Sequence, residues 1–298
     1  MNNHVLFPNP FRTEGLWMKG NLHSHTTNSD GLLTPSQVVL LYETGGYDFL
    51  SITDHDKLTD VESLEHEGII LLPGEEVSIG KLHLVAFNIK REIEAKDPEE
   101  VIKEAESQGG EVIVAHPYWS SLTIEDLENI KGCLGIEVYN ATCEISVAKG
   151  YANVYWDILL SKGRITYGFA VDDIHTGGLI PYRRPSDAYK GWIMVKVKEK
   201  NSESLMESLR KGLFYSTMGP EIRDLQVEDE IIRVKSSPAR VISFISRNGL
   251  GKRFFACDKP LTEAAYVMRG GESYVRIEIE DEKGRRAWTN PIIIRRKE

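Results

Sequence analysis

Histidines and carboxylates recur in short clusters along the first 175 residues of this 298-residue chain. Two of the clusters are His23-Ser24-His25 and Asp173-Ile174-His175. Residues two apart in an extended segment point to the same side, so each pair can offer two side chains to one ion. Asp172 is an alternative to Asp173 as the ligand that accompanies His175, but only Asp173 shares a face with His175 in an extended chain. Imidazole and carboxylate groups without thiolate are typical ligands of divalent transition metals, so the clusters predict a metal centre.

Two further positions, Asp30 and His55, extend this set. Asp30 lies in the turn Asn28-Ser29-Asp30-Gly31, where its carboxylate could reach an adjacent ion, although turn formation alone would also explain it. His55 stands between Asp54 and Asp56, and either aspartate could instead orient the imidazole ring. We expect no general acid among Asp54, Asp56 and Asp172.

Glutamates and two isolated histidines complete the candidates. Glu75 and Glu76 follow the apolar run IILLPG, and we expect one of them to bridge two ions, because a carboxylate can use both oxygens. His83 is flanked by apolar residues, which is also typical of a histidine packed in a core. His116 ends the run VIVA and precedes Pro117, which keeps the residue before it extended.

The elements that must position these residues are short apolar runs, which alternate with helical patterns between about Leu16 and Tyr215. This alternation predicts βα units around a parallel sheet, in which the carboxyl ends of the strands converge on one rim. Helix starts at Thr34-Pro35 and Asp97-Pro98, with glycine pairs after each helix, support the pattern. We expect strands at Trp17–Leu22, Phe49–Thr53, Ile69–Leu72, Leu82–Phe87, Val112–Ala115, Gly135–Val138, Ile165–Ala170 and Trp192–Val197.

The sequence pattern changes after Gly219-Pro220. Alternating stretches such as VISFIS and SYVRIEIE, separated by turn residues, predict antiparallel strands. We therefore expect a metal-binding domain over 1–220 and a small β-domain over 221–298 that is structural or acts as a lid.

Composition limits the possible functions. The chain has 36 Lys+Arg and 45 Asp+Glu, and its net charge of −9 disfavours binding to a long nucleic acid. The N-terminus has no basic region followed by an apolar stretch, and no apolar run approaches the roughly 18 residues needed to span a bilayer, which favours a cytoplasmic protein without a membrane anchor. Three cysteines without a CxxC pair suggest neither a disulfide framework nor a thiolate zinc site.

The set of clusters resembles the polymerase and histidinol phosphatase (PHP) family over roughly Lys19 to His175. The similarity is carried by His23-Ser24-His25, Thr53-Asp54-His55, Ala115-His116-Pro117 and Asp173-Ile174-His175, with Asp30, Pro73-Gly74-Glu75-Glu76 and His83 between them. The resemblance implies an α/β fold, a distorted seven-stranded (β/α) barrel, and a trinuclear centre of Mn, Fe or Zn ions. The Gly-x-Glu pattern of the family selects Glu76 as the bridging glutamate.

The resemblance also implies a distribution of ligands. One ion would take His23, His25, Glu76 and Asp173; a second would take Glu76, His83 and His116; a third would take Asp30, His55 and His175. Such ions would lower the pKa of a bound water to roughly 7 and supply the nucleophile of a hydrolase.

Other residues suggest how a substrate is held. Arg183 and Arg184 follow the last cluster and could bind phosphate oxygens, although a solvated basic turn explains them equally well. Tyr118 and Trp119 follow His116 and could stack on a base or an aryl group, or could pack as part of the wall.

Three functions remain open at this point. The first is a phosphoesterase for a small phosphorylated metabolite or nucleotide. The second is a carboxyl or carbamate ester hydrolase, suggested by the similarity of Phe214–Pro220 to a PHP branch with such enzymes. The third is a non-catalytic metal-binding protein, against which the complete ligand set argues. The sequence leaves the substrate, the native metal and the oligomeric state open.

Overall fold

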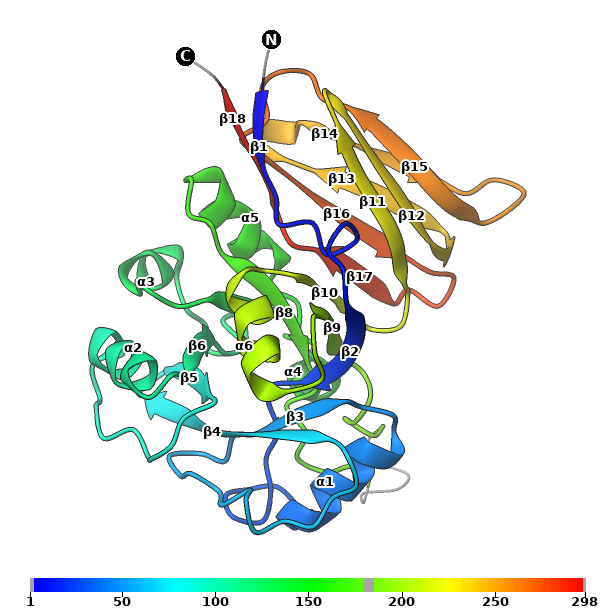
Figure 1. Cartoon of the computed structure of the whole chain (residues 1–298). Helices are drawn as coiled ribbons and strands as arrows, with labels where there is room; N and C mark the ends of the chain where they lie inside the picture. Colours follow the sequence, from blue (N-terminus) through cyan, green and yellow to red (C-terminus); the bar gives the residue numbers. More distant parts are fainter. Residues whose placement is uncertain (1–2, 179–184, 297–298) are drawn as a thin grey trace.

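The computed structural model describes residues 3–178 and 185–296 and has a mixed α/β fold with a central sheet and few helices (Figure 1). In chain order, the elements up to β8 are β1 (Asn3–Leu6), β2 (Leu16–Asn21), α1 (Pro35–Thr44), β3 (Phe49–Ile52), β4 (Ile70–Ile79), β5 (Leu82–Phe87), α2 (Pro98–Ser107), β6 (Glu111–Val114), α3 (Ile124–Asn129), β7 (Gly135–Asn140), α4 (Ala141–Val147), α5 (Asn153–Ser161) and β8 (Tyr167–Val171). The remaining elements are β9 (Trp192–Val197), α6 (Ser202–Arg210), β10 (Phe214–Thr217), β11 (Ile222–Glu228), β12 (Ile231–Ala239), β13 (Val241–Ile245), the 3₁₀ turn Arg247–Gly249, β14 (Gly251–Phe255), β15 (Leu261–Val267), β16 (Tyr274–Glu280), β17 (Arg286–Thr289) and β18 (Ile292–Arg296).

The two predicted helix starts are confirmed by their capping contacts. The Thr34 side chain accepts a hydrogen bond from the backbone N–H of Gln37, whose side chain in turn accepts from the Thr34 N–H, so that α1 begins with a capping box. The Asp97 carboxylate accepts from the N–H groups of Glu99 and Glu100 at the start of α2. Within residues 3–178 and 185–296, no helix is long and apolar enough to cross a membrane.

The central sheet is mostly parallel, as the sequence predicts, but β5 and β9 run antiparallel to their neighbours. Strands β2 to β8 pair in sequence order, and β2–β3–β4 and β6–β7–β8 are parallel. In contrast, β5 is antiparallel to both neighbours, because the two-residue turn Gly80-Lys81 leaves no room for the crossover helix that a parallel pair needs. The expectation of an uninterrupted series of parallel βα units is therefore wrong at β5. It is also wrong at β9, which pairs antiparallel with β2 and β10.

The two ends of this strand series meet beyond β2 and β8. An isolated parallel bridge joins Ser24 to Ile174, and the N–H of His25 donates to the Ile174 carbonyl at 3.0 Å. The sheet is thus curled so that the segments after its first and last strands lie side by side. Closure into a complete seven-stranded barrel stays a prediction.

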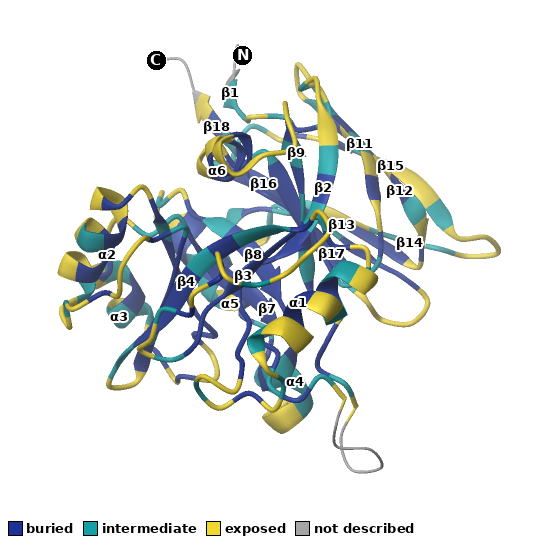
Figure 2. Cartoon of the chain, turned by 60° about the horizontal axis from the view of Figure 1, so that its bottom comes forward, coloured by how far each residue is buried: buried dark blue, intermediate teal, exposed yellow. Residues whose placement is uncertain are grey.

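Alternate residues of the curled sheet form a buried apolar core on its inner side. Residues of this core come from most of the strands and include Met18, Phe49, Val85, Ile113, Phe169 and Val195. The alternating neighbours of β5, such as Leu84 and Ala86, pack instead with residues of α2, α3 and α5. Figure 2 shows the buried strands in the middle of the molecule, with exposed residues on the outer helices. The strands that carry the predicted ligands are therefore packed on both faces.

After Pro220 the chain forms antiparallel β-structure. Strands β11, β12 and β15 make one sheet, while β13, β14, β16, β17 and β18 are joined to the central sheet through the pairing of β17 with β10. The two chain ends lie together, because β1 pairs with β18 (Figure 1). The division of the chain at residue 220 stays a prediction.

An ion pair between a buried arginine and a partly exposed aspartate links α5 to β16. The guanidinium of Arg276, which is 1% exposed, donates two hydrogen bonds to the Asp157 carboxylate, at 2.7 Å and 2.6 Å. We expect Asp157→Asn to lower the free energy of unfolding by about 3 kcal/mol, because it leaves the buried guanidinium against a neutral amide. Urea denaturation followed by circular dichroism measures this change.

An exposed ion pair provides the control. Lys162 contacts Glu128 at 2.7 Å, but both side chains are more than a third exposed. Lys162→Ala should change the free energy of unfolding by less than about 1 kcal/mol. Equal effects of the two substitutions would contradict the importance of the Arg276–Asp157 pair.

Candidate metal centre

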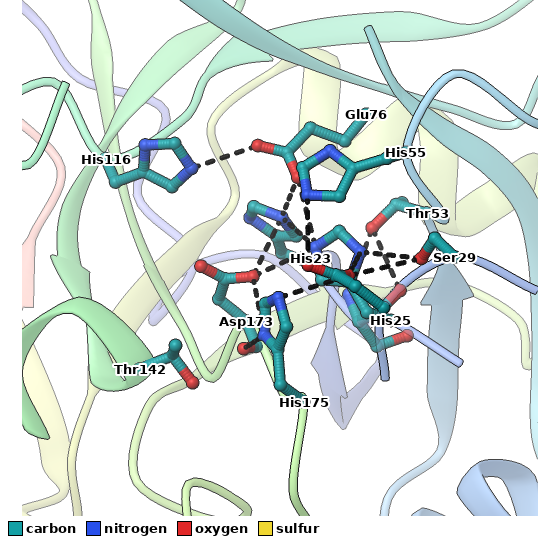
Figure 3. A network of polar contacts seen from close by, with 12 residues as sticks. His23, His25, Ser29, Thr53, His55, Glu76, His116, Thr142, Asp173 and His175 are labelled. Atoms are coloured by element: carbon teal, nitrogen blue, oxygen red, sulfur yellow. Dashed lines mark hydrogen bonds and ion pairs between the residues drawn. The ribbon is translucent and has the colours of Figure 1, made fainter. Parts of the chain in front are cut away.

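The nine predicted ligands lie together at one rim of the sheet, and Figure 3 shows most of them pointing toward a common centre. They are His23, His25 and Asp30 from the segment after β2, His55 after β3, Glu76 in β4, His83 in β5, His116 after β6, and Asp173 and His175 after β8. This rim is where carboxyl ends of parallel strands converge. Because β5 runs in the opposite direction, its amino-terminal end lies at this rim. His83 is therefore near the start of its strand, whereas most other predicted ligands follow the ends of theirs.

The deepest part of the cluster is a group of four side chains. The Nε2 atoms of His23 and His25 are 3.0 Å apart, and each lies 3.0–3.1 Å from Glu76 Oε2 and from Asp173 Oδ1. All four residues are at most 3% exposed. Two imidazole nitrogens and two carboxylate oxygens therefore converge on one buried point.

The second oxygen of Glu76 faces another pair of histidines. Glu76 Oε1 lies 2.8 Å from His83 Nδ1 and 2.9 Å from His116 Nε2. Side chains alternate along a strand, so the neighbouring Glu75 points away from the cluster, and its carboxylate accepts from the N–H of Ile93 at 2.9 Å. The structure thus brings Glu76, and not Glu75, between the histidine groups.

A third group lies closer to the surface. Asp30 is the most exposed member, with its side chain 57% exposed, and its oxygens lie 3.4 Å from His175 Nε2 and 3.8 Å from His55 Nε2. His25 Nδ1 is 3.7 Å from the same carboxylate. The ligand atoms of His25, Asp30, His55 and His175 all lie within 4.8 Å of one another.

The donor set and its unsatisfied atoms fit bound cations. Asp173 Oδ1 and His55 Nδ1 are buried, yet neither has a hydrogen-bond partner among the described residues. Buried polar atoms are normally paired, so each such atom requires an explanation, and a bound cation provides one. Imidazole and carboxylate ligands suit Mn, Fe and Zn ions. The residues present therefore fit the implied metals.

The electrostatics of the cluster also favour positive charge. Burial alone would lower the pKa of His25, but the nearby carboxylates of Asp173 and Glu76 raise it to about 9. Burial likewise opposes protonation of His23, yet Asp173, Glu76 and Glu137 together raise its pKa well above the ordinary value. The carboxylates that favour a proton on these rings would also favour a metal cation at the same place.

Two of the predicted ligands have unusual backbone conformations. His116 has φ of 24° and Asp173 has φ of 53°, in a region that residues other than glycine adopt infrequently. Conformations of this kind cost of order 1 kcal/mol or more and are frequent at functional sites. The surrounding contacts hold the two residues in place, as the Asp173 N–H donates to the His23 carbonyl at 3.1 Å.

The sequence analysis missed a buried glutamate that supports the cluster. Glu137 lies in β7 and is 1% exposed. Its Oε1 lies 2.6 Å from His23 Nδ1, and its Oε2 accepts from the His116 N–H and from the Asn140 side chain, which also donates to Asp173 Oδ2. A single acidic residue in the apolar run GIEVYN was the available signal.

Other aspartates position the loops of the site instead of facing its centre. Asp54 is completely buried and accepts from the Thr26 N–H and from the hydroxyls of Thr26, Ser29 and Thr59, which fixes the loop that leads to Asp30. Asp56 instead contacts Lys96 at 2.7 Å near the surface. Of the two aspartates beside His55, Asp54 thus supports the ligand loop and Asp56 does not.

Two more buried aspartates hold the segments around His175. Asp172 accepts from the N–H groups of residues 189–191 and from the hydroxyl of Tyr42, so it faces away from the cluster, and burial raises its pKa to about 6. Asp187, which the sequence analysis also missed, accepts from the N–H groups of His175, Thr176 and Gly177. Only the aspartate on the same face as His175 joins the centre, as predicted.

A cavity of about 280 Å³ opens above the cluster. Its lining comprises Asp30, His55, Glu76, His83, His116, Trp119, Thr142, Cys143, Ser146, Asp173 and His175. Of the two aromatic residues predicted at the rim, Trp119 lines the cavity and Tyr118 does not. Arg183 and Arg184, the predicted substrate-binding residues, lie outside the described residues.

Comparison with solved structures finds a chain with the same fold. A two-domain protein from Bacteroides vulgatus, described as containing a predicted PHP-like metal-dependent phosphoesterase, aligns over 94% of this chain and 95% of its own, with a TM-score of 0.54 and 19% identity. A metal-dependent phosphoesterase from Bifidobacterium adolescentis aligns over 65% of this chain and 96% of its own, with a TM-score of 0.41 and 16% identity.

Sequence comparison gives shorter matches. The 5'-3' exoribonuclease Rnm of Salmonella typhimurium is 39% identical over 79 residues, which cover 23% of this chain and 27% of that protein. The 5'-3' exoribonuclease of Haemophilus influenzae is 32% identical over 81 residues, which cover 24% of this chain and 30% of that protein. No family model matches the chain. The PHP resemblance inferred from the sequence motifs is thus confirmed at the level of the fold, which this chain shares with a PHP-like metal-dependent phosphoesterase.

Proposed function

We propose that the chain is a metal-dependent hydrolase that cleaves phosphoric esters of a small metabolite or nucleotide. The observation that supports this most is the convergence of His23 Nε2, His25 Nε2, Glu76 Oε2 and Asp173 Oδ1 on one buried point, with Asp173 Oδ1 lacking a hydrogen bond. Ligand atoms arranged in this way would hold a cation at the base of a cavity that a substrate can enter.

The ligands suggest three divalent ions, of Mn, Fe or Zn. We assign one ion to His23, His25, Glu76 and Asp173, a second to Glu76, His83 and His116, and a third to Asp30, His55 and His175. When bound, such ions would supply an activated water and neutralise the charge of a phosphoryl group. A closed seven-stranded barrel of PHP type is part of the same proposal.

The chain's own groups would bind and orient the ions, and the substrate would approach from the cavity. Glu76 would bridge the first two ions, because its two oxygens face different histidines. Glu137 would keep the proton of His23 on Nδ1, since a carboxylate can only accept there, so that Nε2 faces the centre. No described lysine or arginine lines the cavity. The ions would neutralise the phosphoryl charge, and Arg183 and Arg184 stay our proposed phosphate-binding residues.

A small substrate suits both the cavity and the charge of the chain. At about 280 Å³, the cavity is at the lower end of the range for small-molecule sites. The net charge of −9 opposes long nucleic acids. The exoribonuclease matches make a nucleotide substrate worth including beside simple phosphate esters.

Metal removal and replacement test this proposal. Protein dialysed against a chelator should lose at least about 95% of its activity on p-nitrophenyl phosphate, because hydrolysis at such a site depends on the ions. Mn²⁺, Fe²⁺ or Zn²⁺ should restore it, and metal analysis should find two to three ions per chain. Circular dichroism before and after dialysis shows whether the fold survives.

A panel of substrates distinguishes a phosphoesterase from the two alternative functions. It includes phosphate monoesters, phosphodiesters, a short oligoribonucleotide, aryl acetates and carbamates. Cleavage of the carboxyl or carbamate esters alone would favour the second function. A metal-loaded protein that cleaves none of them would support a non-catalytic metal-binding protein and would overturn the proposal.

A further inference from the structure

Trp119 contributes an indole ring to the wall of the cavity above the candidate metal centre. Trp119 is 43% exposed and lines the cavity together with His83, His116 and residues of α4. Its ring centroid lies 4.9 Å from that of His116 and 6.0 Å from that of His83, with the ring planes steeply tilted to both. The indole ring therefore stands beside two predicted ligands while much of its surface stays open.

Hydrogen bonds define the backbone turn that carries Trp119. The N–H of Ser120 donates to the His116 carbonyl at 3.1 Å, and the N–H of Leu122 donates to the Pro117 carbonyl at 3.0 Å. The Ser120 hydroxyl also lies 3.0 Å from His116 Nδ1. The tight turn that presents His116 to the centre thus presents Trp119 to the cavity.

The indole N–H of Trp119 has no hydrogen-bond acceptor within residues 3–178 and 185–296. An exposed indole with an apolar face and an available donor is a combination that ligand sites commonly use. Tyr118, which is 41% exposed, instead lies near Lys149, whose ammonium is 5.5 Å from its ring centre. Two adjacent aromatic residues of equal exposure therefore differ in whether they face the site.

We propose that Trp119 is a specificity-determining residue that favours substrates whose leaving group contains a single planar ring system. The ring would lie against the indole while the phosphoryl group lies over the metal ligands. A cavity of about 280 Å³ has room for both parts. This inference rests on the proposed phosphoesterase function, and it adds the class of leaving group.

The role of Trp119 is tested by kinetics on two phosphate esters that differ in whether the leaving group contains a ring. Phenyl phosphate and ethyl phosphate are compared for the wild type, Trp119→Ala, Trp119→Phe and Tyr118→Ala, all loaded with Mn²⁺. Trp119→Ala should lower kcat/KM for phenyl phosphate about fivefold, mainly through KM, and change that for ethyl phosphate by less than twofold, because aromatic contacts of this kind have modest energies. Trp119→Phe should retain most of the preference, and Tyr118→Ala should retain all of it.

Equal losses on both esters would assign Trp119 a structural role in holding His83 and His116, and would overturn the inference. Binding measurements keep the test independent of turnover. Calorimetry should show that the wild type binds phenylphosphonate more tightly than methylphosphonate and that Trp119→Ala removes the difference. Failure of phenylphosphonate to bind, or equal affinity for both phosphonates, would also overturn it. A ring preference in binding without hydrolysis of any phosphate ester would leave the inference intact and reject the proposed function.

Discussion

Replacing Glu76 by glutamine should lower kcat/KM for phosphate monoesters by at least about a thousandfold, which corresponds to about 4 kcal/mol of transition-state stabilisation. The carboxylate lies at the centre of the cluster, and its two oxygens face different groups of histidines. Glutamine keeps the size of the side chain but removes its charge and one of its two acceptors. The histidines within 3.3 Å of the Glu76 oxygens are His23, His25, His55, His83 and His116.

Metal content should fall together with activity. A neutral amide can present only one oxygen, so ions on the two sides of Glu76 would no longer share a ligand. We expect the variant to retain at least one ion fewer per chain than the wild type after the same loading and desalting. Metal analysis by mass spectrometry, combined with kinetics on p-nitrophenyl phosphate, measures both effects.

The neighbouring glutamate is a matched control. Glu75 is equally buried in the same strand, but it points away from the cluster and accepts from the N–H of Ile93. Burial raises its pKa to about 7, so a neutral glutamine resembles a form that this residue already adopts near neutral pH. Glu75→Gln should keep activity within about threefold, since the amide oxygen can still accept that bond. Similar losses in both variants would contradict the central role of Glu76.

The sequence identified the candidate ligands better than it identified the buried acids that hold them in place. The pairs His23–His25 and Asp173–His175 could be identified because side chains alternate in extended segments and because the apolar runs before them mark strands. Most predicted strands agree with the structure to within two residues. These features are local, so a single sequence contains the information that determines them.

Features that depend on distant partners could not be predicted in the same way. Strand β4 continues through Ile79, although the residues Gly74, Glu75 and Glu76 interrupt its apolar pattern, because pairing with β5 supports it there. The reversal of β5 follows from that hairpin. The strand β10 was not predicted, and it joins the central sheet to the strands after Pro220.

The same reason explains the missed side chains. Glu137 and Asp187 act on groups at His23 and His175, which lie 114 and 12 residues away from them in sequence. Nothing near either acid indicates such a partner. Likewise, Tyr118 and Trp119 are equivalent in the sequence, and only the course of the turn after His116 separates the cavity residue from the outer one.

The second large effect is expected at Glu137. Its carboxylate accepts three N–H bonds, one at Oε1 from His23 Nδ1 and two at Oε2 from the His116 backbone and the Asn140 side chain. A glutamine has a single oxygen, so its amide group must face an N–H donor at one of these ends. Glu137→Gln should therefore disturb either the ring of His23 or the backbone of His116.

We expect this substitution to lower kcat/KM by about 10- to 100-fold, the range found for groups that orient metal ligands. It should also lower the free energy of unfolding by roughly 1–3 kcal/mol, because a buried donor loses its acceptor. Kinetics at saturating Mn²⁺, metal titration and urea denaturation of the metal-free protein separate the two effects.

Glu272 supplies a control with the same chemistry in a distant place. It is 4% exposed, and its carboxylate accepts from the hydroxyl of Tyr266 and from the N–H groups of Arg269 and Gly271. Glu272→Gln should destabilise the fold by a similar amount while leaving kcat/KM per folded molecule unchanged, because none of its partners belongs to the centre. If both variants keep full activity, the bond from His23 to Glu137 has no part in positioning the ligand; if both lose activity equally, the loss reflects unfolding.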